Sequence, residues 1–360
     1  MKERFLMKGN EAIAEAAIRA GCRCYFGYPI TPQTEIAAYM SKHMKQSGGV
    51  FLQAESEIAA INMVLGAAAV GARAMTSSSS PGISLKSEAI SYIAGSDLPC
   101  VIINVQRAGP GLGGIQPSQA DYFQATRGLG HGDFYLMVFA PSTIQESVDI
   151  MSVAFDLSEK YRVPCFILSD GIIGQMMEPV SFPEETSFSF AQKDWALTGT
   201  QGKRPPNIIN SLILSPQALE KSIQERFARY ELIKKNEVRF ESYLLEDADI
   251  AVVAFGAAAR MAKSAVNEAR QNGIKVGLFR PVSLWPFPSQ ELLALKKKIK
   301  HLLCVEMNMG QMIEDVKLAV NGTIPVSFYG RTGGCVPSPE EIIKEIILLD
   351  KNDKERGNKL

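Results

Sequence analysis

Residues 24–35, CYFGYPITPQTE, place a short apolar run directly before a turn with two prolines, and a helical pattern follows the turn. Proline fixes its own backbone and favours extended geometry in the residue before it, so this turn is stiff. Thr31 is a candidate N-cap, with Pro32 at the first helical position. The segment equally fits a rigid loop that holds the Thr31 hydroxyl where a ligand can reach it. Both interpretations predict a strand, a turn and a helix in this order.

The same alternation continues through residues 10–180. Near-continuous apolar strands that are joined by helices predict an α/β fold with a parallel sheet covered on both faces. Ligands of such sheets gather in the loops beyond the carboxyl ends of the strands. Helical patterns cover 11–21, 34–48, 57–71, 84–95 and 143–163, and strand patterns cover 24–30, 51–56, 72–79, 99–107, 136–141 and 164–171.

The alternation stops at residue 181 and returns near residue 246. Residues 181–245 are polar and turn-rich at first and then helical over 218–246, which predicts a linker with one long helix. Residues 246–347 predict a second, smaller α/β domain, with strands over 249–256, 275–281, 301–307 and 324–330. We expect residues 348–360 to form a C-terminal tail, frayed and solvated over KNDKERGNKL (351–360).

The composition is that of an ordinary soluble chain. Its 360 residues are 46% apolar and carry zero formal net charge, so we expect neither a nucleic acid nor a membrane as partner, and a cytoplasmic location. The amino-terminal residues lack the apolar core of a secretory signal. Six cysteines include no CxxC pair and there are only three histidines, which predicts no iron–sulfur cluster and no metal site on this chain.

Residues 109–114, GPGLGG, formally match the GxGxxG pattern of dinucleotide-binding loops. Pro110 and the lack of a helix directly afterwards argue against that function. A dehydrogenase that used this loop would bind NAD as an isolated chain. We interpret the segment as a flexible loop that places Arg107 at the rim of the sheet edge. Arg107 there is either a bidentate partner for a carboxylate or a surface ion-pair residue.

Three further groups follow predicted strands. Glu55 and Glu57 open an apolar helix, where a carboxylate either caps the helix or projects toward the position of Thr31. The serines at 77–80 are either ligand-lining or turn-forming, and no histidine is placed to activate them. Asp170 and the glycine after it lack the neighbours of a GDG metal motif, so a diphosphate–magnesium site is not evident.

Several of these segments together resemble the alpha-type subunits of the 2-oxoacid:ferredoxin oxidoreductases. They are GYPITPQTEI, QAESEIAAINMVLGAAAVGARAMTSSSSPG, VIINVQRAGPGLG and GHGDF. The 2-oxoisovalerate (branched-chain) members are the most similar and the 2-oxoglutarate members come next. The resemblance covers essentially the whole chain. It implies a thiamine diphosphate-binding, pyrimidine-domain fold over 1–180 and a transketolase C-terminal-like α/β domain over 246–347.

The resemblance also implies site residues. Glu57 matches the acid that bonds the aminopyrimidine ring nitrogen of thiamine diphosphate, with Glu55 as the reserve candidate. Thr31 matches a threonine near the substrate, and Arg107 matches an arginine for the 2-oxo acid carboxylate. The expected catalytic residues are thus Glu57, Thr31 and Arg107, and the expected cofactor-binding residues are Glu57, Pro29, Ile30, Ser79 and Ser80.

The implied reaction converts a 2-oxo acid and coenzyme A to acyl-CoA, carbon dioxide and reduced ferredoxin. The resemblance implies a beta-type subunit that holds the diphosphate and Mg²⁺, a gamma-type subunit, a ferredoxin-like subunit, and 4Fe–4S clusters on those partners. We therefore expect this chain to be inactive alone, with a homodimer as its isolated form. The alternatives are a 2-oxoglutarate-specific subunit and a non-catalytic scaffold subunit.

Overall fold

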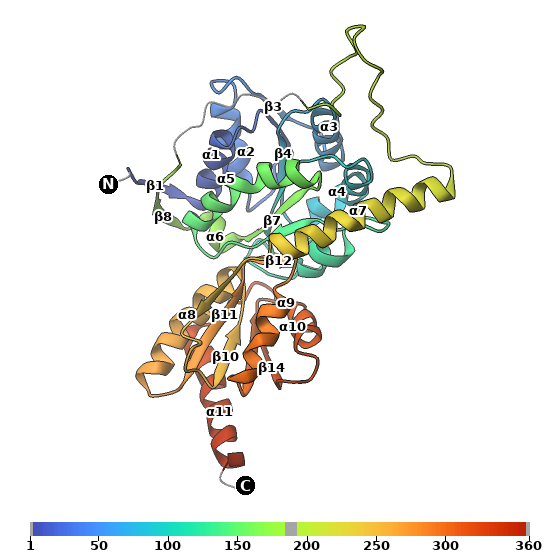
Figure 1. Cartoon of the computed structure of the whole chain (residues 1–360). Coiled ribbons are helices and arrows are strands. Elements are labelled where there is room, and N and C mark those ends of the chain that lie inside the picture. Colours follow the sequence, from blue (N-terminus) through green and yellow to red (C-terminus); the bar gives the residue numbers. More distant parts are fainter. Residues whose placement is uncertain (1–2, 184–192, 358–360) are drawn as a thin grey trace.

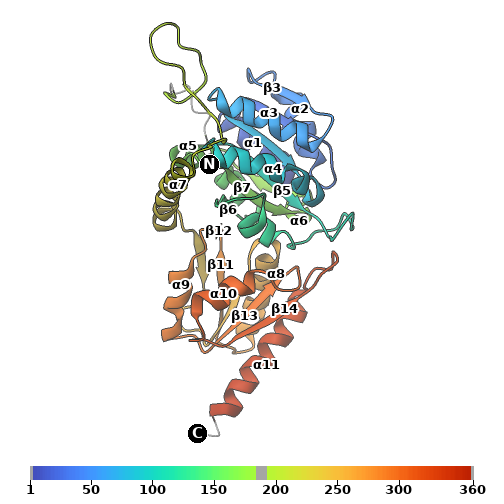
Figure 2. The same ribbon diagram turned by 90° about the vertical axis from the view of Figure 1, so that its right-hand side faces the viewer.

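The computed structural model describes residues 3–183 and 193–357, which form two lobes, each built around a mainly parallel sheet (Figure 1). The parts of the predicted linker at 184–192 and of the predicted tail at 358–360 lie outside the described residues. Seen from the side, the first sheet lies above the second, and the carboxyl-terminal helix points away from both (Figure 2). The predicted α/β class is confirmed.

The first lobe contains a seven-stranded sheet of order β12-β6-β7-β5-β4-β2-β3, parallel except for β12. Its central strands β5 and β7 are buried along their whole length, as expected for strands covered on both faces. All six strands predicted for residues 1–180 are present. The seven strands of the sheet are these six, β2 (Cys24–Gly27), β3 (Val50–Gln53), β4 (Ala74–Ser78), β5 (Val101–Gln106), β6 (Met137–Phe139) and β7 (Cys165–Asp170), and in addition β12 (Ser283–Trp285).

The helices of this lobe pack in groups. The first helix contacts the second and fifth, and the third packs on the fourth and against β2 and β4. They are α1 (Gly9–Arg19), α2 (Thr34–His43), α3 (Glu57–Ala69), α4 (Ser80–Gly95), α5 (Ile144–Tyr161) and α6 (Gly171–Gln175), with one π-helical turn at Gln124–Gly128. The sequence did not predict the antiparallel pair β1 (Phe5–Lys8) and β8 (Met177–Val180).

The second lobe is a five-stranded sheet of order β14-β13-β10-β11-β9, in which only β9 is antiparallel. A long helix, α7 (Pro216–Asn236), lies along the first lobe, and the chain passes from its end into the second lobe (Figure 1). The other elements are β9 (Phe240–Tyr243), β10 (Ile250–Val253), α8 (Gly256–Gln271), β11 (Val276–Pro281), α9 (Ser289–Ala294) with a 3-10 turn at Leu295–Lys297, β13 (His301–Glu306), α10 (Met312–Val320), β14 (Val326–Gly330) and α11 (Pro339–Gly357).

Two element predictions are wrong. The helix predicted over 218–246 ends at Asn236, because Phe240 and its neighbours pair with β11 and the Phe240 ring stacks on Phe279. The irregular structure predicted from residue 351 is instead the last part of α11, which reaches Gly357. This helix is anchored by its buried residues Ile342 and Ile346, which pack in the core of the second lobe with α8.

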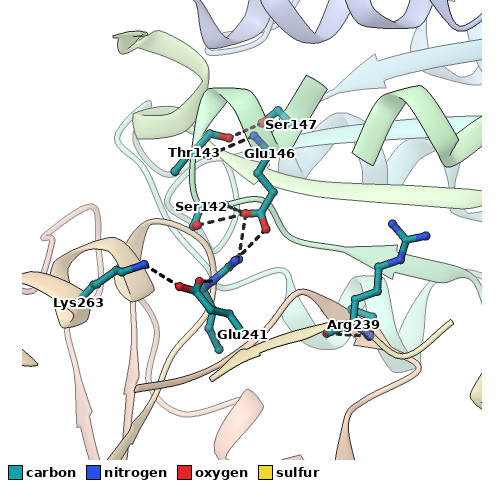
Figure 3. A network of polar contacts seen from close by, with 9 residues as sticks. Ser142, Thr143, Glu146, Ser147, Arg239, Glu241 and Lys263 are labelled. Atoms are coloured by element: carbon teal, nitrogen blue, oxygen red, sulfur yellow. Dashed lines mark hydrogen bonds and ion pairs between the residues drawn. The ribbon is translucent and has the colours of Figure 1, made fainter. Parts of the chain in front are cut away.

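A polar network joins the two lobes (Figure 3). Arg280 of β11 donates two hydrogen bonds to the Glu146 carboxylate at the start of α5, at 2.8 and 2.9 Å. Its Nε donates to Glu241 of β9 at 2.7 Å, and Lys263 of α8 donates to the same carboxylate at 2.6 Å. Charged groups of both lobes therefore neutralise one another at the joint.

Side chain–backbone bonds add a second connection. Gln119 donates to the Phe255 carbonyl at 2.7 Å and accepts from the Met307 amide at 3.0 Å. The Asn308 side chain donates to the Gln119 carbonyl at 2.8 Å. The segment after β5 is thereby fixed to the second lobe.

Across the described ranges, none of the helices combines the length and apolar character that a membrane crossing requires.

Candidate functional site

The loops with the predicted site residues meet at one edge of the first sheet. Strands β2, β4 and β5 are neighbours and run parallel, so their carboxyl ends lie at the same edge. The turn after β2, the serines at the end of β4 and the segment after β5 follow these ends, and the amino terminus of α3 joins them through β3.

The loop after β2 is a tight turn and not the first turn of a helix. The Gln33 amide donates to the Ile30 carbonyl at 3.1 Å, and α2 begins only at Thr34. The predicted N-cap role of Thr31 is therefore wrong: Gln33 is the N-cap residue, and the Thr31 side chain is exposed. The Thr31–Pro32 peptide bond is cis.

The side chains of a buried asparagine and a half-buried glutamine hold this turn. Asn10 of α1 donates to the Pro32 carbonyl at 2.7 Å, and Gln175 donates to the same oxygen at 3.0 Å. Both side chains also donate to the Glu35 carboxylate, and together with Lys8 they keep the pKa of Glu35 below its usual value although burial opposes this. The rigid loop predicted from the prolines is thus fixed by polar contacts as well.

Glu57 is the first residue of α3 and is only 6% exposed. The helix is capped by Ser56, whose hydroxyl accepts from the Ala59 amide at 3.2 Å, so Glu57 is not needed as the cap. Among the described residues its carboxylate forms no hydrogen bond or ion pair. Glu55 is exposed. Of the two acids that the sequence left open, only Glu57 is buried beside α4.

Gly82 makes room for this carboxylate. A Cβ at position 82 would lie 2.6 Å from Glu57 Oε1 and 2.1 Å from Ser78 Oγ. Real Cβ atoms are not found this close to other atoms, so a larger residue would displace the Glu57 carboxylate. The first turn of α4 therefore forms one wall around Glu57.

The four serines have different environments. Ser77 Oγ donates to Gln33 Oε1 at 2.5 Å and bonds the Tyr25 hydroxyl at 2.7 Å. Ser80 Oγ donates to Asp121 at 2.5 Å. The hydroxyls of Ser78 and Ser79 are buried without a partner in the described part of the chain. Buried polar groups are almost always satisfied, so these two hydroxyls indicate a missing bonding group.

Arg107 lies directly after β5, 7% exposed, and not at an open rim. Its Nη1 donates to the Thr31 carbonyl at 3.1 Å and its Nη2 to the Leu112 carbonyl at 3.2 Å. Its backbone amide donates to Ser80 Oγ at 3.1 Å. Its Nε has no partner among the described residues. The structure thus brings Arg107, Thr31 and the serine run together.

Asp121 is connected to Arg107 through Ser80, and the sequence did not predict this residue. Its carboxylate accepts from Ser80 and, at 2.8 Å, from Asn104. Burial raises the pKa of Asp121, while the bonds from Ser80 and Asn104 act in the opposite direction.

Lys86 of α4 was not predicted from the sequence either. A lysine within the helical pattern ISLKSEAI is typical of a solvated face, and only the structure shows that this one is buried, with its ammonium bonded to Thr76 of β4.

Asp170, considered above as a metal ligand, has another role. Its Oδ1 accepts from the Ile172 and Ile173 amides at 2.8 and 3.2 Å, which caps α6, and its Oδ2 accepts from the Ala257 amide at 3.3 Å. In the ranges that the structure describes, no group of three or more His, Cys, Asp or Glu is arranged to hold a metal ion. All six cysteines are free thiols.

Two family models match the chain. A model described as pyruvate flavodoxin/ferredoxin oxidoreductase, thiamine diphosphate-binding, matches residues 15–235. A model described as pyruvate:ferredoxin oxidoreductase core domain II matches residues 248–342. Together they cover both lobes.

Individual relatives match over nearly the full length. The chain is 47% identical to ketoisovalerate oxidoreductase subunit VorB of Methanothermobacter marburgensis, over 97% of this chain and 99% of that protein. It is 35% identical to 2-oxoglutarate synthase subunit KorA of Methanothermobacter thermautotrophicus, over 98% of this chain and 100% of that one.

Solved structures show the same architecture. The 2-oxoglutarate:ferredoxin oxidoreductase from Magnetococcus marinus, with 2-oxoglutarate, coenzyme A and succinyl-CoA bound, superposes with a TM-score of 0.88 at 28% identity. The superposition covers 97% of this chain and 66% of that chain. A split-gene transketolase in an inactive beta4 tetramer shares the fold, with a TM-score of 0.58 at 14% identity.

Proposed function

The chain belongs to the pyruvate flavodoxin/ferredoxin oxidoreductase family, as an alpha-type subunit of a 2-oxoacid oxidoreductase, and from this premise we propose that it contributes half of a thiamine diphosphate-dependent active site. The assembled enzyme converts a 2-oxo acid and coenzyme A to acyl-CoA, carbon dioxide and reduced ferredoxin. The substrate that we propose is 2-oxoisovalerate, because identity to ketoisovalerate oxidoreductase subunits (47%) exceeds identity to a 2-oxoglutarate synthase subunit (35%).

The observation that carries the proposal is the set of unsatisfied polar groups around α4. Among the described residues the Ser78 and Ser79 hydroxyls are buried without partners. The buried Glu57, whose carboxylate lies beside position 82 together with Ser78 Oγ, forms no hydrogen bond in the same part of the chain. An aminopyrimidine ring offers ring nitrogens and an amino group as complementary partners for a carboxylate and hydroxyls. These residues therefore fit the pyrimidine half of thiamine diphosphate, which supplies a nucleophilic carbon when bound.

Each site residue has a specific part in the proposed mechanism. Glu57 holds a proton at the ring nitrogen of the pyrimidine, and its burial strengthens this hydrogen bond. Pro29 and Ile30 form a wall whose position is fixed by the turn. Ser79 donates to or accepts from the ring. Ser80, already bonded to Asp121 and to the Arg107 amide, acts by positioning Arg107.

Arg107 and Thr31 form the proposed substrate side. Arg107 has an Nε donor without a partner in the described chain, and we assign this donor to the carboxylate of the 2-oxo acid. The Thr31 carbonyl accepts from Arg107, so the turn and the arginine position each other. The exposed Thr31 hydroxyl is then within the same region as the substrate.

The partner subunits are also part of the proposal. Similar proteins are named as subunits. This chain has exposed apolar side chains, Ile58 of α3 and Leu85 and Tyr92 of α4, on the helix that begins with Glu57 and on the helix that packs against it. We assign this surface to contact with the subunit that holds the diphosphate and Mg²⁺. The 4Fe–4S clusters lie on partner chains, so the chain alone is inactive. The complex is assigned to the cytoplasm.

Glu57→Gln in the complex assembled with its partner subunits tests the assignment. We expect turnover to fall at least 100-fold, because an amide cannot take up and release the proton, while size-exclusion chromatography shows intact assembly. The matched control is Glu55→Gln, an exposed acid two residues away, which should retain activity. Near-normal turnover of Glu57→Gln, or loss only in Glu55→Gln, contradicts the assignment.

A 2-oxoglutarate-specific enzyme is the second candidate, favoured by the structural match to a protein with 2-oxoglutarate bound. The two substrates differ by a distal carboxylate on 2-oxoglutarate. Comparison of kcat/KM of the assembled complex over a panel of 2-oxo acids distinguishes them. We expect the branched apolar acid to be preferred, and a preference for 2-oxoglutarate would replace this proposal by the alternative.

A further inference from the structure

Lys86 is the one lysine that is fully buried in the described part of the chain. It lies on α4, and its ammonium donates to Thr76 Oγ1 at 2.6 Å and to the Ser77 carbonyl at 3.2 Å. A buried ammonium is costly unless a negative charge compensates it. Neither of these two acceptors carries a charge, so a negative charge nearby would stabilise the ammonium.

Glu57 is the acid placed to provide it. A Cβ at Gly82 would lie 2.6 Å from Glu57 Oε1, and Gly82 is one helical turn before Lys86 on the same face of α4. A helical side chain leans toward the amino terminus of its helix, which brings Lys86 back toward this turn. Burial lowers the pKa of the Lys86 ammonium to about 7, and the Glu57 charge acts against this decrease.

Other titratable groups near this pair are tied to other partners. Tyr25 of β2 bonds Ser77, and burial raises the pKa of its hydroxyl far above neutral pH. Asp121 is bonded to Ser80 and Asn104. Arg107 donates to backbone carbonyls of its own loop and of the turn after β2. Lys86 and Glu57 differ from these groups, because Lys86 bonds only the uncharged Thr76 and Ser77 acceptors and the Glu57 carboxylate forms no hydrogen bond in the described part of the chain.

We propose that Lys86 is a positioning residue whose positive charge, held against Thr76 and Ser77 of β4, keeps the nearby Glu57 carboxylate ionised for the cofactor ring. This inference rests on the function proposed above. Lys86 acts through Glu57 and touches neither cofactor nor substrate. Since a cation favours the ionised form of a nearby carboxylate, it sets the pH range in which Glu57 can accept a proton from the ring. Thr76 and the Ser77 carbonyl fix the ammonium so that it is available to the acid.

Lys86→Met and Lys86→Gln in the assembled complex separate this role from a structural one. Methionine has a similar length without charge, and glutamine retains a donor for Thr76. In both variants we expect the acid limb of the kcat/KM profile to move up by about one pH unit and the thiamine diphosphate Kd, measured by calorimetry, to rise about tenfold. Residue 86 contacts no substrate, so KM for the 2-oxo acid should change less than kcat.

A double-mutant cycle with Glu57→Gln is the second readout. If Lys86 acts through Glu57, adding Lys86→Met to Glu57→Gln should change the cofactor Kd less than twofold. An unmoved acid limb in both variants, or the same tenfold change in the Glu57→Gln background, overturns the proposal. If Lys86→Gln behaves like wild type, hydrogen bonding and not charge explains Lys86, and the proposal is wrong.

The outcome is distinguishable from failure of the proposed function. If Glu57→Gln alone leaves cofactor affinity and turnover unchanged, the assignment of Glu57 fails. If Glu57→Gln is inactive but the Lys86 variants keep the wild-type pH profile, only the role of Lys86 fails. Asp121→Asn, measured in parallel, identifies any part of the acid limb that belongs to that carboxylate. Should Lys86→Met not fold, Lys86→Gln carries the test.

Discussion

At the residue scale, the serine run 77–80 shows how identical neighbours take different positions. Ser77 bonds Gln33 and Tyr25 beneath the turn, and Ser80 supports the segment around Arg107. The two serines between them have no partner in the described chain. Because hydroxyls are alike in sequence, the sequence predicted a polar edge at 77–80 but not which members of it are satisfied.

The choice between Glu55 and Glu57 was open for the same reason, because two chemically alike residues cannot be distinguished in the sequence. Both follow a strand and open a helix, and the sequence left the choice open before the family resemblance favoured Glu57. Burial beside Gly82 distinguishes the two, and it depends on the packing of α3 on α4. Lys86 was not predicted because a single lysine in a helical pattern carries no sign of burial.

Gly82→Ala tests the wall around Glu57. The added methyl group would meet Ser78 Oγ and Glu57 Oε1, both side-chain ends that can shift, so we expect the chain to fold and the carboxylate to move. Thiamine diphosphate affinity of the assembled complex, measured by calorimetry, should fall about tenfold, comparable to 1.4 kcal/mol.

Gly66→Ala is the matched control. Gly66 is also a helical glycine, and a Cβ there meets nothing within 4 Å. This variant should unfold at a higher temperature, with a gain of up to about 1 kcal/mol, and bind the cofactor like wild type. Equal cofactor affinity in both variants would show that Gly82 is not needed for the position of Glu57.

At the scale of elements, segments with a local apolar pattern were predictable, and strands defined by distant partners were not. All six strands predicted before residue 180 are present, because apolar runs bounded by turns are a local signal. β9 and β12, of four and three residues, are defined by partners distant in sequence, β11 and β6. The helical pattern over 218–246 was therefore extended through β9, although α7 ends at Asn236.

Asp170 links three elements and predicts a pH effect. It ends β7, caps α6 and accepts from Ala257 at the start of α8. Burial raises the pKa of this carboxyl from 3.8 to about 6, so between these values the folded chain keeps a proton that the unfolded chain has lost. The contribution of Asp170 to the free energy of unfolding is roughly 3 kcal/mol. It is fully present below about pH 4 and is lost as the pH rises through about 6.

Asp170→Asn removes this titration and keeps an acceptor for the α6 amides. Urea unfolding is followed by circular dichroism at about pH 4.5, 5.5 and 6.5. We expect the free energy of unfolding of wild type to fall relative to that of the variant as the pH rises. Parallel pH dependence of the two proteins would mean that Asp170 does not retain its proton in the folded chain.

At the scale of the whole molecule, the two sheets are not separable by one cut in the sequence. β12 follows β11 of the second lobe but pairs with β6 of the first. The Arg280 network and Gln119 bind the same two lobes through side chains. The sequence predicted two α/β units, and it could not predict this joint, because each of its residues is far from its partner along the chain.

Arg280→Met tests the joint. Removal of the guanidinium leaves Glu146 and Glu241 facing each other without their shared cation. Because these carboxylates keep 21% and 30% exposure, we expect a loss of roughly 2–3 kcal/mol in the free energy of unfolding, below the range for fully buried pairs. Denaturant unfolding by circular dichroism should also become less cooperative.

Lys221→Met is the control for loss of a positive charge. Lys221 pairs with Glu225 at 3.9 Å on the surface of α7, with both side chains largely exposed. Its removal should cost less than about 0.5 kcal/mol. A comparable loss in the two variants would indicate that general charge balance, and not the joint, explains the effect.

The stacking of Trp285 on Tyr135 makes the joint optically visible. The sequence contains two tryptophans, and the Trp285 ring, on β12, lies 4.7 Å from Tyr135 at an angle of 13°. The other, Trp195, lies under the Arg162 guanidinium at 4.7 Å, away from β12. Indole emission of the unlabelled chain therefore has one component, from Trp285, that reports whether β12, which follows β11 of the second lobe, stays paired with β6 of the first lobe. Loss of this pairing will change the wavelength and intensity of that component.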